Sequence, residues 1–177
     1  MTDFTSISYL RTGNLKQKKA YNILNKYRIM DHLKDFDSIL VGTIPIGIDI
    51  ETSDLDIICF WKDQVQFRQK LTESFSGFEL FDIRDISINN ALTTVSNFFV
   101  DGFEIEIFGQ NVPAKKQFGY RHMIIENTLL LEKGESFRSE ILNLKREGYK
   151  TEPAFAKALG IKGDPYQELL KFERTNF

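Results

Sequence analysis

The sequence has 177 residues, of which 42% are hydrophobic and 27% are charged, and its formal net charge is −2 at pH 7. These values are typical of one globular domain, and they argue against strong non-specific binding to nucleic acid. The only cysteine, Cys59, cannot form a disulfide within the chain, no run is long and apolar enough to span a membrane, and the N-terminus lacks a signal-peptide pattern. We therefore expect a cytoplasmic protein that does not contact a membrane.

The first predicted helix follows Asn14, a residue type that is favourable at a helix N-cap. Apolar residues recur at helical spacing over Leu15–Leu33, which predicts one long amphipathic helix. Three lysines, Lys16, Lys18 and Lys19, lie near its start. A solvated face is the simple interpretation of these lysines, and contact with a substrate phosphate is the alternative.

The middle of the chain is predicted to form two strands joined by a loop. The first strand, Ser38–Val41, ends at Gly42 and Thr43, where glycine allows a positive φ or the close approach of a ligand. The loop contains Pro45 and is rich in turn-forming residues, which disfavours a regular helix. The second strand, Leu55–Trp61, is an almost continuous apolar run, and this indicates a central position in a sheet.

Two acidic residues, Asp54 and Asp56, lie at the start of the second strand. Because side chains alternate along a strand, we expect both carboxylates to point to the same face. Two adjacent carboxylates repel each other unless a cation lies between them, so a divalent metal is their natural partner. The alternative is an acidic face in water.

A helix over Lys62–Phe75 and three strands follow the acidic pair. The strands are predicted at Phe78–Asp85, Leu92–Val100 and Phe103–Phe108. The last two are joined by Asp101-Gly102, a strong signal for a hairpin with a type I′ turn, because both residue types tolerate a positive φ.

The last strand of this hairpin carries two glutamates, Glu104 and Glu106. Their side chains alternate with that of Ile105 and therefore share one face. Either glutamate could add a third carboxylate to Asp54 and Asp56. The simpler alternative is a hairpin with one polar face in water, which is common in antiparallel sheets.

The rest of the chain is predicted to be helical. Helices are expected over Gln117–Lys133, Ser136–Glu147, Thr151–Leu159 and Asp164–Phe172. The order of the elements predicts an α+β fold, in which a mixed β-sheet is flanked by helices and followed by a helical C-terminal part. We expect residues 1–133 to form the core and residues 134–177 to pack on it within one domain.

Arg121 and His122 lie near the start of the first of these helices, soon after the strand that carries the glutamates. Both could therefore overhang the acidic residues. Arg121 could neutralise phosphate oxygens, and His122 could contact a ribose or a base. A single histidine is more often a structural residue than a catalytic one.

The spacing between Gly42-Thr43 and the segment DLDI (residues 54–57) resembles the signature of the nucleotidyltransferase superfamily, whose fold is that of the polymerase-beta palm. The segments GTIPIGID, SDLDI, EIFGQ and YRHM are together similar to a bacterial family of this fold that has no assigned activity. The resemblance implies a nucleotidyltransferase-like mixed sheet flanked by helices.

The resemblance also implies a metal site and a nucleotide site. Asp54, Asp56 and a later carboxylate, for which Glu106 is preferred over Glu104, would bind Mg²⁺ or Mn²⁺. The nucleotide would be bound by Gly42, Thr43, Ser53, Arg121 and His122. The chain departs from the superfamily in two ways. A glutamate stands in place of the commoner aspartate, and a loop with proline and glycine replaces the short helix that would point at the phosphates.

The activity implied by the resemblance is Mg²⁺-dependent transfer of an NMP group from a nucleoside triphosphate, the substrate, to an acceptor. The acceptor would be a small molecule, a protein or an RNA end. Two alternatives remain open. One is a catalytically inactive nucleotide-binding or regulatory protein of the same fold, of the toxin–antitoxin type. The other is a structural module whose acidic residues only face water.

Overall fold

The computed structural model describes residues 2–88 and 90–173. Over these residues the strands form one five-stranded sheet in the order β1-β2-β5-β4-β3. The strands are β1 (Ile39–Val41), β2 (Leu55–Phe60), β3 (Glu79–Ile88), β4 (Ala91–Val100) and β5 (Phe103–Gln110). Strands β2 and β5 pair in parallel, and the other pairs are antiparallel. The sheet is therefore mixed, with β2 in its interior, as the sequence predicted.

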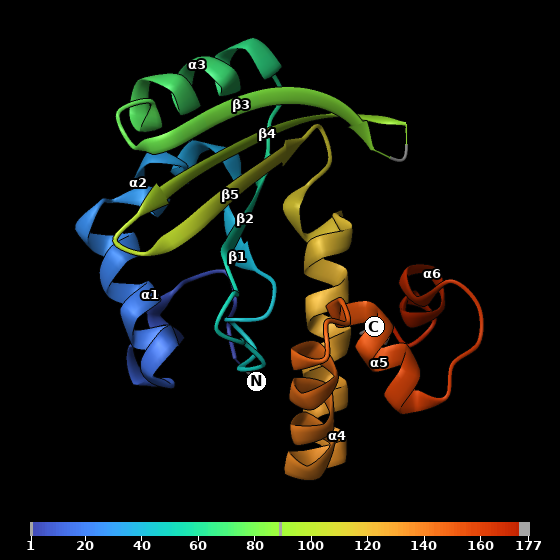
Figure 1. The fold of residues 1–177 in the computed structure, drawn as a ribbon. Coiled ribbons are helices and arrows are strands. Elements are labelled where there is room, and N and C mark those ends of the chain that lie inside the picture. The colour runs from blue at the N-terminus through green and yellow to red at the C-terminus, as the bar shows by residue number, and fades with distance from the viewer. Residues whose placement is uncertain (1, 89, 174–177) are drawn as a thin grey trace.

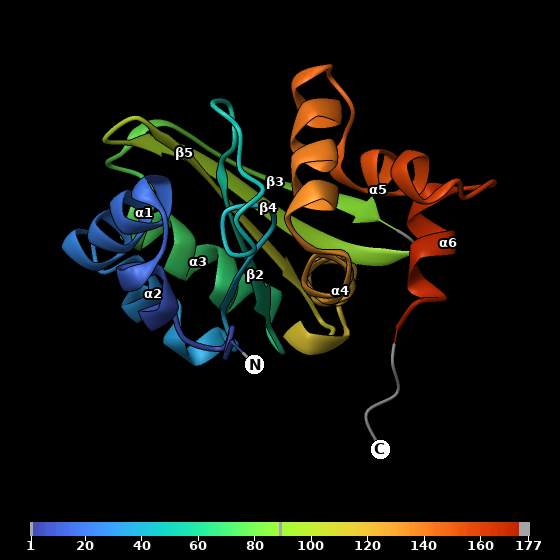
Figure 2. The same ribbon diagram turned by 90° about the horizontal axis from the view of Figure 1, so that it is seen from below.

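The helices gather in two groups on different sides of the molecule (Figures 1 and 2). The α-helices are α1 (Leu15–Lys26), α2 (Ile29–His32), α3 (Gln64–Phe75), α4 (Phe118–Arg146), α5 (Thr151–Leu159) and α6 (Pro165–Leu170). Short 3₁₀ turns cover Ser8–Thr12, Lys34–Phe36 and Ala114–Lys116. Among the described residues no helix is long and apolar enough to cross a bilayer.

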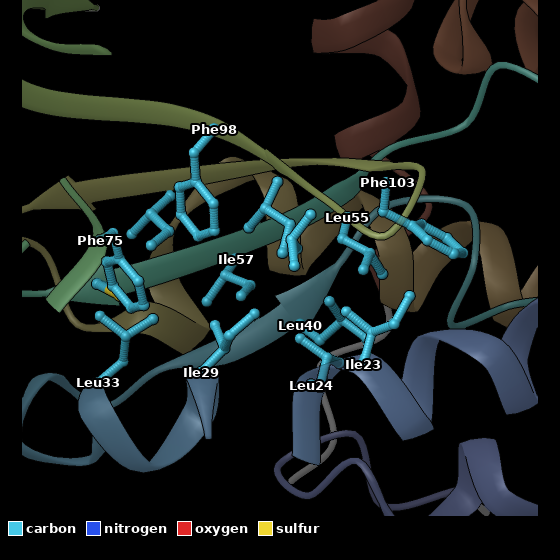
Figure 3. Packing of buried hydrophobic residues seen from close by; sticks show 14 of the residues in the cluster. Ile23, Leu24, Ile29, Leu33, Leu40, Leu55, Ile57, Phe75, Phe98 and Phe103 are labelled. Carbon is cyan, nitrogen blue, oxygen red and sulfur yellow. The ribbon is translucent and has the colours of Figure 1, made fainter. Parts of the chain in front are cut away.

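One hydrophobic core, core A, joins α1, α2 and α3 to one face of the sheet (Figure 3). Ile57 of β2 and Phe98 of β4 are fully buried in it. The ring of Phe98 stacks on Phe75 of α3 at a centroid distance of 4.9 Å and on Phe78 at 5.1 Å. Buried aromatic side chains contribute large apolar areas, so these rings fix α3 against the sheet.

A second core, core B, joins the C-terminal helices to the opposite face of β1 and β2. Val41 and Ile58 of these strands belong to the same cluster as Met123 of α4, Phe155 of α5 and Leu169 of α6. The alternation of side chains along β2 separates the two cores, because Ile57 faces core A while Ile58 faces core B.

The helix boundaries differ from the prediction in one place. The helix expected over 15–33 is divided, because Arg28 has a left-handed φ of 52° between α1 and α2. The break expected between the helices over 117–133 and 136–147 is confirmed, since Gly134 within α4 has a non-helical φ of 78° and ψ of −165° and kinks the element there. The predicted cap is confirmed, since the Asn14 side chain accepts a hydrogen bond from the backbone N–H of Gln17 at 2.8 Å.

The hairpin turn also follows the sequence signal. Asp101 and Gly102 have φ values of 45° and 82°, as a type I′ turn requires. Strand β3 extends three residues beyond its predicted end at Asp85, and β5 extends to Gln110. Long paired strands keep β4 and β5 in register, and this register fixes the side chains described next.

Candidate active site

One row of paired residues crosses the whole sheet and carries the predicted acidic residues. Val41 of β1 pairs with Asp56 of β2, Asp56 pairs with Glu106 of β5, Glu106 with Asn97 of β4, and Asn97 with Asp82 of β3. Directly paired residues in a sheet point to the same face. Asp56 and Glu106 are therefore neighbours on two adjacent parallel strands.

These acidic residues line a cleft of about 670 Å³ between the sheet, the loop that follows β1, helix α4 and the segment that follows α4. Seven of the eight residues predicted for the site line this cleft: Gly42, Thr43, Ser53, Asp54, Asp56, Glu106 and His122. Residues separated by as many as 80 positions in the sequence thus meet in one cavity.

Asp56 occupies a position where ionisation is unfavourable. Burial raises the pKa of Asp56 to about 8, and the neighbouring carboxylates of Asp54 and Glu106 act in the same direction. Lys145 has the opposite effect on this pKa. A further positive charge beside Asp56 would relieve the repulsion.

The chemistry of the donor set suits a hard divalent cation, because Asp54, Asp56 and Glu106 supply only carboxylate oxygens. The three side chains lie around the same cleft. Across residues 2–88 and 90–173, however, no three His, Cys, Asp or Glu side chains are gathered closely enough to form a ready metal cluster. The residues fit Mg²⁺ in type and in face, and binding would require their oxygens to move closer together.

Gly42 allows the loop backbone to approach Asp56. Its φ is +84°, and a Cβ built at this position would collide with Oδ2 of Asp56. The hydroxyl groups of Thr43 and Ser53 form hydrogen bonds within this loop. Thr43 Oγ1 donates to Ser53 Oγ at 3.1 Å, and Ser53 Oγ accepts from the backbone N–H of Ile50 at 2.9 Å. The loop is a series of turns and not a helix, as the sequence predicted.

Among the described residues, three side chains from outside the loop donate hydrogen bonds to its backbone carbonyl oxygens. Lys16 Nζ of α1 donates to the carbonyl oxygen of Ile50 at 2.6 Å, and Gln17 Nε2 donates to that of Ile44 at 2.8 Å. Arg138 of α4 donates through one Nη1 atom to the carbonyl oxygens of Ile46 at 2.7 Å and Gly47 at 3.1 Å. Lys16, one of the three lysines considered above as phosphate ligands, thus contacts the loop backbone.

The two glutamates of β5 have different positions. Glu106 lines the cleft and pairs with Asp56, whereas Glu104 pairs with Phe99 and is not among the cleft-lining residues. Asn97 lies between them, and its Nδ2 is 3.3 Å from Glu104 Oε1 and 3.3 Å from Glu106 Oε2.

Arg121 and His122 both have protein partners. Arg121 pairs with Glu173 at 2.6 Å and is not among the cleft-lining residues. His122 lines the cleft, but its Nε2 is 2.9 Å from the carbonyl oxygen of Tyr166, to which it must donate, and its Nδ1 is 3.4 Å from Glu152 Oε1. His122 therefore connects α4, α5 and α6.

The cleft also contains two buried ionisable residues that the sequence patterns did not indicate as site residues, Glu126 and Lys145. Burial raises the pKa of Glu126 to about 8, and its Oε1 has no hydrogen-bond partner among the described residues. Burial lowers the pKa of Lys145, while Glu126 acts in the opposite direction. The signal in the sequence is a charged residue on an apolar helical stripe, since Lys145 follows Ile141 by four residues.

The fold is similar to solved structures of nucleotide polymerases. Cid1, described as having RNA terminal uridylyl transferase activity, gives a TM-score of 0.55 at 12% identity over 81% of this chain and 47% of that chain. Cid1 poly(U) polymerase with Mg 3′-dATP bound gives 0.50 at 15% identity, with coverages of 87% and 46%. The polymerase core of TRAMP, an RNA surveillance complex, gives 0.51 at 10% identity, with coverages of 92% and 50%.

This chain thus spans about half the length of these structures. At such low identities the likeness shows the fold, and it confirms the predicted nucleotidyltransferase-like mixed sheet with helices. A family model described as "Domain of unknown function (DUF4269)" matches residues 22–172. No curated protein matches the sequence.

Proposed function

The protein belongs to the DUF4269 family, and we propose that it is a metal-dependent nucleotidyltransferase, which transfers an NMP group from a nucleoside triphosphate to an acceptor. One observation carries this proposal. Asp56 and Glu106 pair on adjacent parallel strands at a cleft that is also lined by Asp54 and by the Gly42-Thr43 loop. The similarity of the fold to nucleotidyltransferases supports it.

Asp54, Asp56 and Glu106 are the residues that would hold Mg²⁺ or Mn²⁺. When bound, the ion would shield the triphosphate and lower the pKa of the attacking acceptor hydroxyl. The raised pKa of Asp56 supports this assignment, because a carboxyl group that is costly to ionise in the free protein gains most from a cation.

The chain itself would bind and orient the triphosphate. The loop after Gly42 lines the cleft and would supply backbone N–H groups, and Lys145 supplies a buried ammonium group in the same cleft. Backbone amides and a lysine are suitable partners for phosphate oxygens. Gly42 allows Asp56 Oδ2 to lie against the loop backbone, where the Cβ of any other residue would collide with it.

The transfer would proceed by in-line displacement at the α-phosphorus. The acceptor oxygen forms a bond to this phosphorus, the bond to the oxygen that bridges to the β-phosphate breaks, and pyrophosphate leaves. Glu106 would accept the proton of the acceptor hydroxyl. A small molecule, a protein or an RNA end could supply this hydroxyl.

A second candidate function is nucleotide binding without transfer, as in a regulatory protein of the toxin–antitoxin type. The hydrogen bond between Thr43 and Ser53 favours it, because both hydroxyls proposed for phosphate binding are already engaged in the loop. The loop also lacks the helix N-terminus that would direct several N–H groups at a phosphate.

Thermal-shift titrations with ATP, CTP, GTP and UTP, each with and without Mg²⁺, test the proposal. A ligand that binds only the native state raises its stability with the logarithm of ligand concentration. We expect a Mg²⁺-dependent shift with at least one nucleotide, and its loss in the Asp54→Asn, Asp56→Asn double variant. No shift with any nucleotide would contradict both candidate functions.

Release of pyrophosphate distinguishes the two candidates. The nucleotide that gives the shift is incubated with Mg²⁺ and with acceptor pools of small molecules, proteins or RNA, and pyrophosphate is measured. Release by the wild type that the double variant does not support indicates transfer. Binding without release from any pool indicates the regulatory function.

A further inference from the structure

A chain of hydrogen bonds runs along the sheet toward the cleft from its outer strand. Arg84 Nη1 of β3 donates to Asp82 Oδ2 and to Asn97 Oδ1, both at 2.9 Å. Asn97 Nδ2 of β4 donates to Glu104 Oε1 and to Glu106 Oε2 of β5, both at 3.3 Å. The chain thus connects an exposed arginine to a carboxylate that lines the cleft.

The chemistry of the partners fixes the orientation of the Asn97 amide. A guanidinium group only donates hydrogen bonds, and an ionised carboxylate only accepts them. The oxygen of the Asn97 amide must therefore face Arg84, and its nitrogen must face the two glutamates. The flipped amide would place donor against donor and acceptor against acceptor.

The sheet register explains why these residues meet. Asp82, Asn97, Glu106 and Asp56 form consecutive pairs of one row across β3, β4, β5 and β2. Asn97, Glu104 and Glu106 are each partly buried, so protein groups supply part of the solvation of the carboxylates. The single Asn97 amide donates one hydrogen bond to each glutamate and so fixes the position of both carboxylates.

We propose that Asn97 is a positioning residue of the active site, which holds Oε2 of Glu106 and leaves its other oxygen for the ligand in the cleft, while Arg84 fixes the direction of the amide. This inference rests on the proposed function. It also assigns a structural role to Glu104 outside the cleft, because Glu104 accepts the other hydrogen bond that the Asn97 amide donates.

The test measures binding of Mn²⁺ alone to the full-length protein by electron paramagnetic resonance of the free ion. Groups that orient metal ligands typically change metal affinity by about 10- to 100-fold when they are replaced. We expect a loss of this size in Asn97→Leu, which has a similar shape but no donor. Asn97→Gln keeps an amide donor, and we expect it to restore part of the affinity.

Two further variants separate positioning from a general effect on folding. Arg84→Met removes the donor that fixes the orientation of the Asn97 amide, and we expect weaker Mn²⁺ binding. Because Arg84 is exposed, the melting temperature should equal that of the wild type. Asp82→Asn alters the other partner of Arg84 and leaves the bond to Asn97, so its Mn²⁺ affinity should equal that of the wild type.

The outcomes distinguish this inference from the proposed function. If Asp56→Asn abolishes Mn²⁺ binding while Asn97→Leu and Arg84→Met bind as the wild type does, the role of Asn97 is overturned and the metal site stands. Equal losses in Asn97→Leu and Asn97→Gln would also overturn it. If the wild type binds no Mn²⁺, the metal site and the inference fall together.

Discussion

Gly42 combines a backbone conformation and a contact that a side chain at this position would disturb. Its φ of +84° is strained for other residues, and Asp56 Oδ2 occupies the space of a Cβ. The identity of one residue at the end of β1 thus decides where the central carboxylate of the cleft can lie.

We predict that Gly42→Ala lowers the free energy of unfolding by about 1–3 kcal/mol and abolishes the nucleotide-dependent thermal shift, because Asp56 is displaced. Gly102→Ala is the matched control, since Gly102 has a similar φ of +82°, but apart from its chain neighbours no atom of the described residues lies within 4 Å of its Cβ position. It should lose stability and keep ligand binding. Retention of the thermal shift in Gly42→Ala would contradict the prediction.

The pKa of Asp56 predicts a pH-dependent gain in stability when its charge is removed. The folded state holds the proton up to about pH 8, whereas the unfolded chain releases it near the ordinary aspartate pKa of 3.8. As the pH rises between these values, the carboxyl group of Asp56 therefore increasingly destabilises the folded state relative to the unfolded chain.

Asp56→Asn should thus be more stable than the wild type in metal-free buffer, by an amount that grows with pH to about 5 kcal/mol near pH 8. Urea unfolding of both proteins with EDTA at about pH 5 and about pH 8 measures the difference. A difference that does not change with pH would show that the Asp56 charge is already compensated in the free protein.

At the scale of the elements, the loop between β1 and β2 depends on groups that lie far away in the sequence. Arg138 of α4 binds two carbonyl oxygens of this loop from about ninety positions away, and its side chain is 21% exposed. Hydrogen bonds from charged donors contribute more than neutral ones, so Arg138 holds the loop more strongly than the neutral amide of Gln17 does.

We predict that Arg138→Met lowers the free energy of unfolding by about 1.5–3 kcal/mol and increases amide hydrogen exchange in residues 43–53. The nucleotide-dependent thermal shift should become smaller, because the loop is less ordered before binding. Glu135→Gln is the control, since Glu135 contacts Arg138 at 3.5 Å but is 81% exposed. Unchanged exchange in the loop would show that the hydrogen bonds from Asn14, Lys16 and Gln17 are sufficient to hold it.

The elements also show what the sequence can predict. The hairpin of β4 and β5, the interior position of β2 and the irregular loop at Pro45 each depend on local residue types, and each is confirmed. The division of the first helix could not be predicted, because Arg28 adopts a left-handed conformation that its residue type does not favour.

The candidate site divides in the same way. Gly42, Asp54 and Asp56 belong to one short segment with a recognisable spacing, and the structure brings them to the cleft. Lys145 and Asn97 reach this region only through the packing of α4 and the register of β4 with β5. Such proximity depends on tertiary structure, and local periodicity contains no information about it.

At the scale of the molecule, the sheet has a hydrophobic core on each face, and the C-terminal helices belong to core B. Phe155 of α5 is fully buried there and contacts Phe137 of α4 edge-to-face at 5.7 Å. Trp61, the only tryptophan, is buried in core A on the other side of the sheet. Because β2 contributes to both cores, we expect residues 1–133 and 134–177 to unfold together.

We predict that Phe155→Ala, which leaves a cavity in core B, lowers the free energy of unfolding by about 3–5 kcal/mol, and that the fluorescence of Trp61 reports the same loss as far-UV circular dichroism. Leu131→Ala is the control, since Leu131 is 66% exposed on α4, and its effect should stay within about 0.5 kcal/mol. An early loss of helical signal with an unchanged Trp61 transition would mean that the C-terminal helices fold as a separate domain. Coincident transitions would mean that the cleft is formed within one cooperative unit, so that a destabilising substitution in α5 also destabilises β2, which carries Asp56.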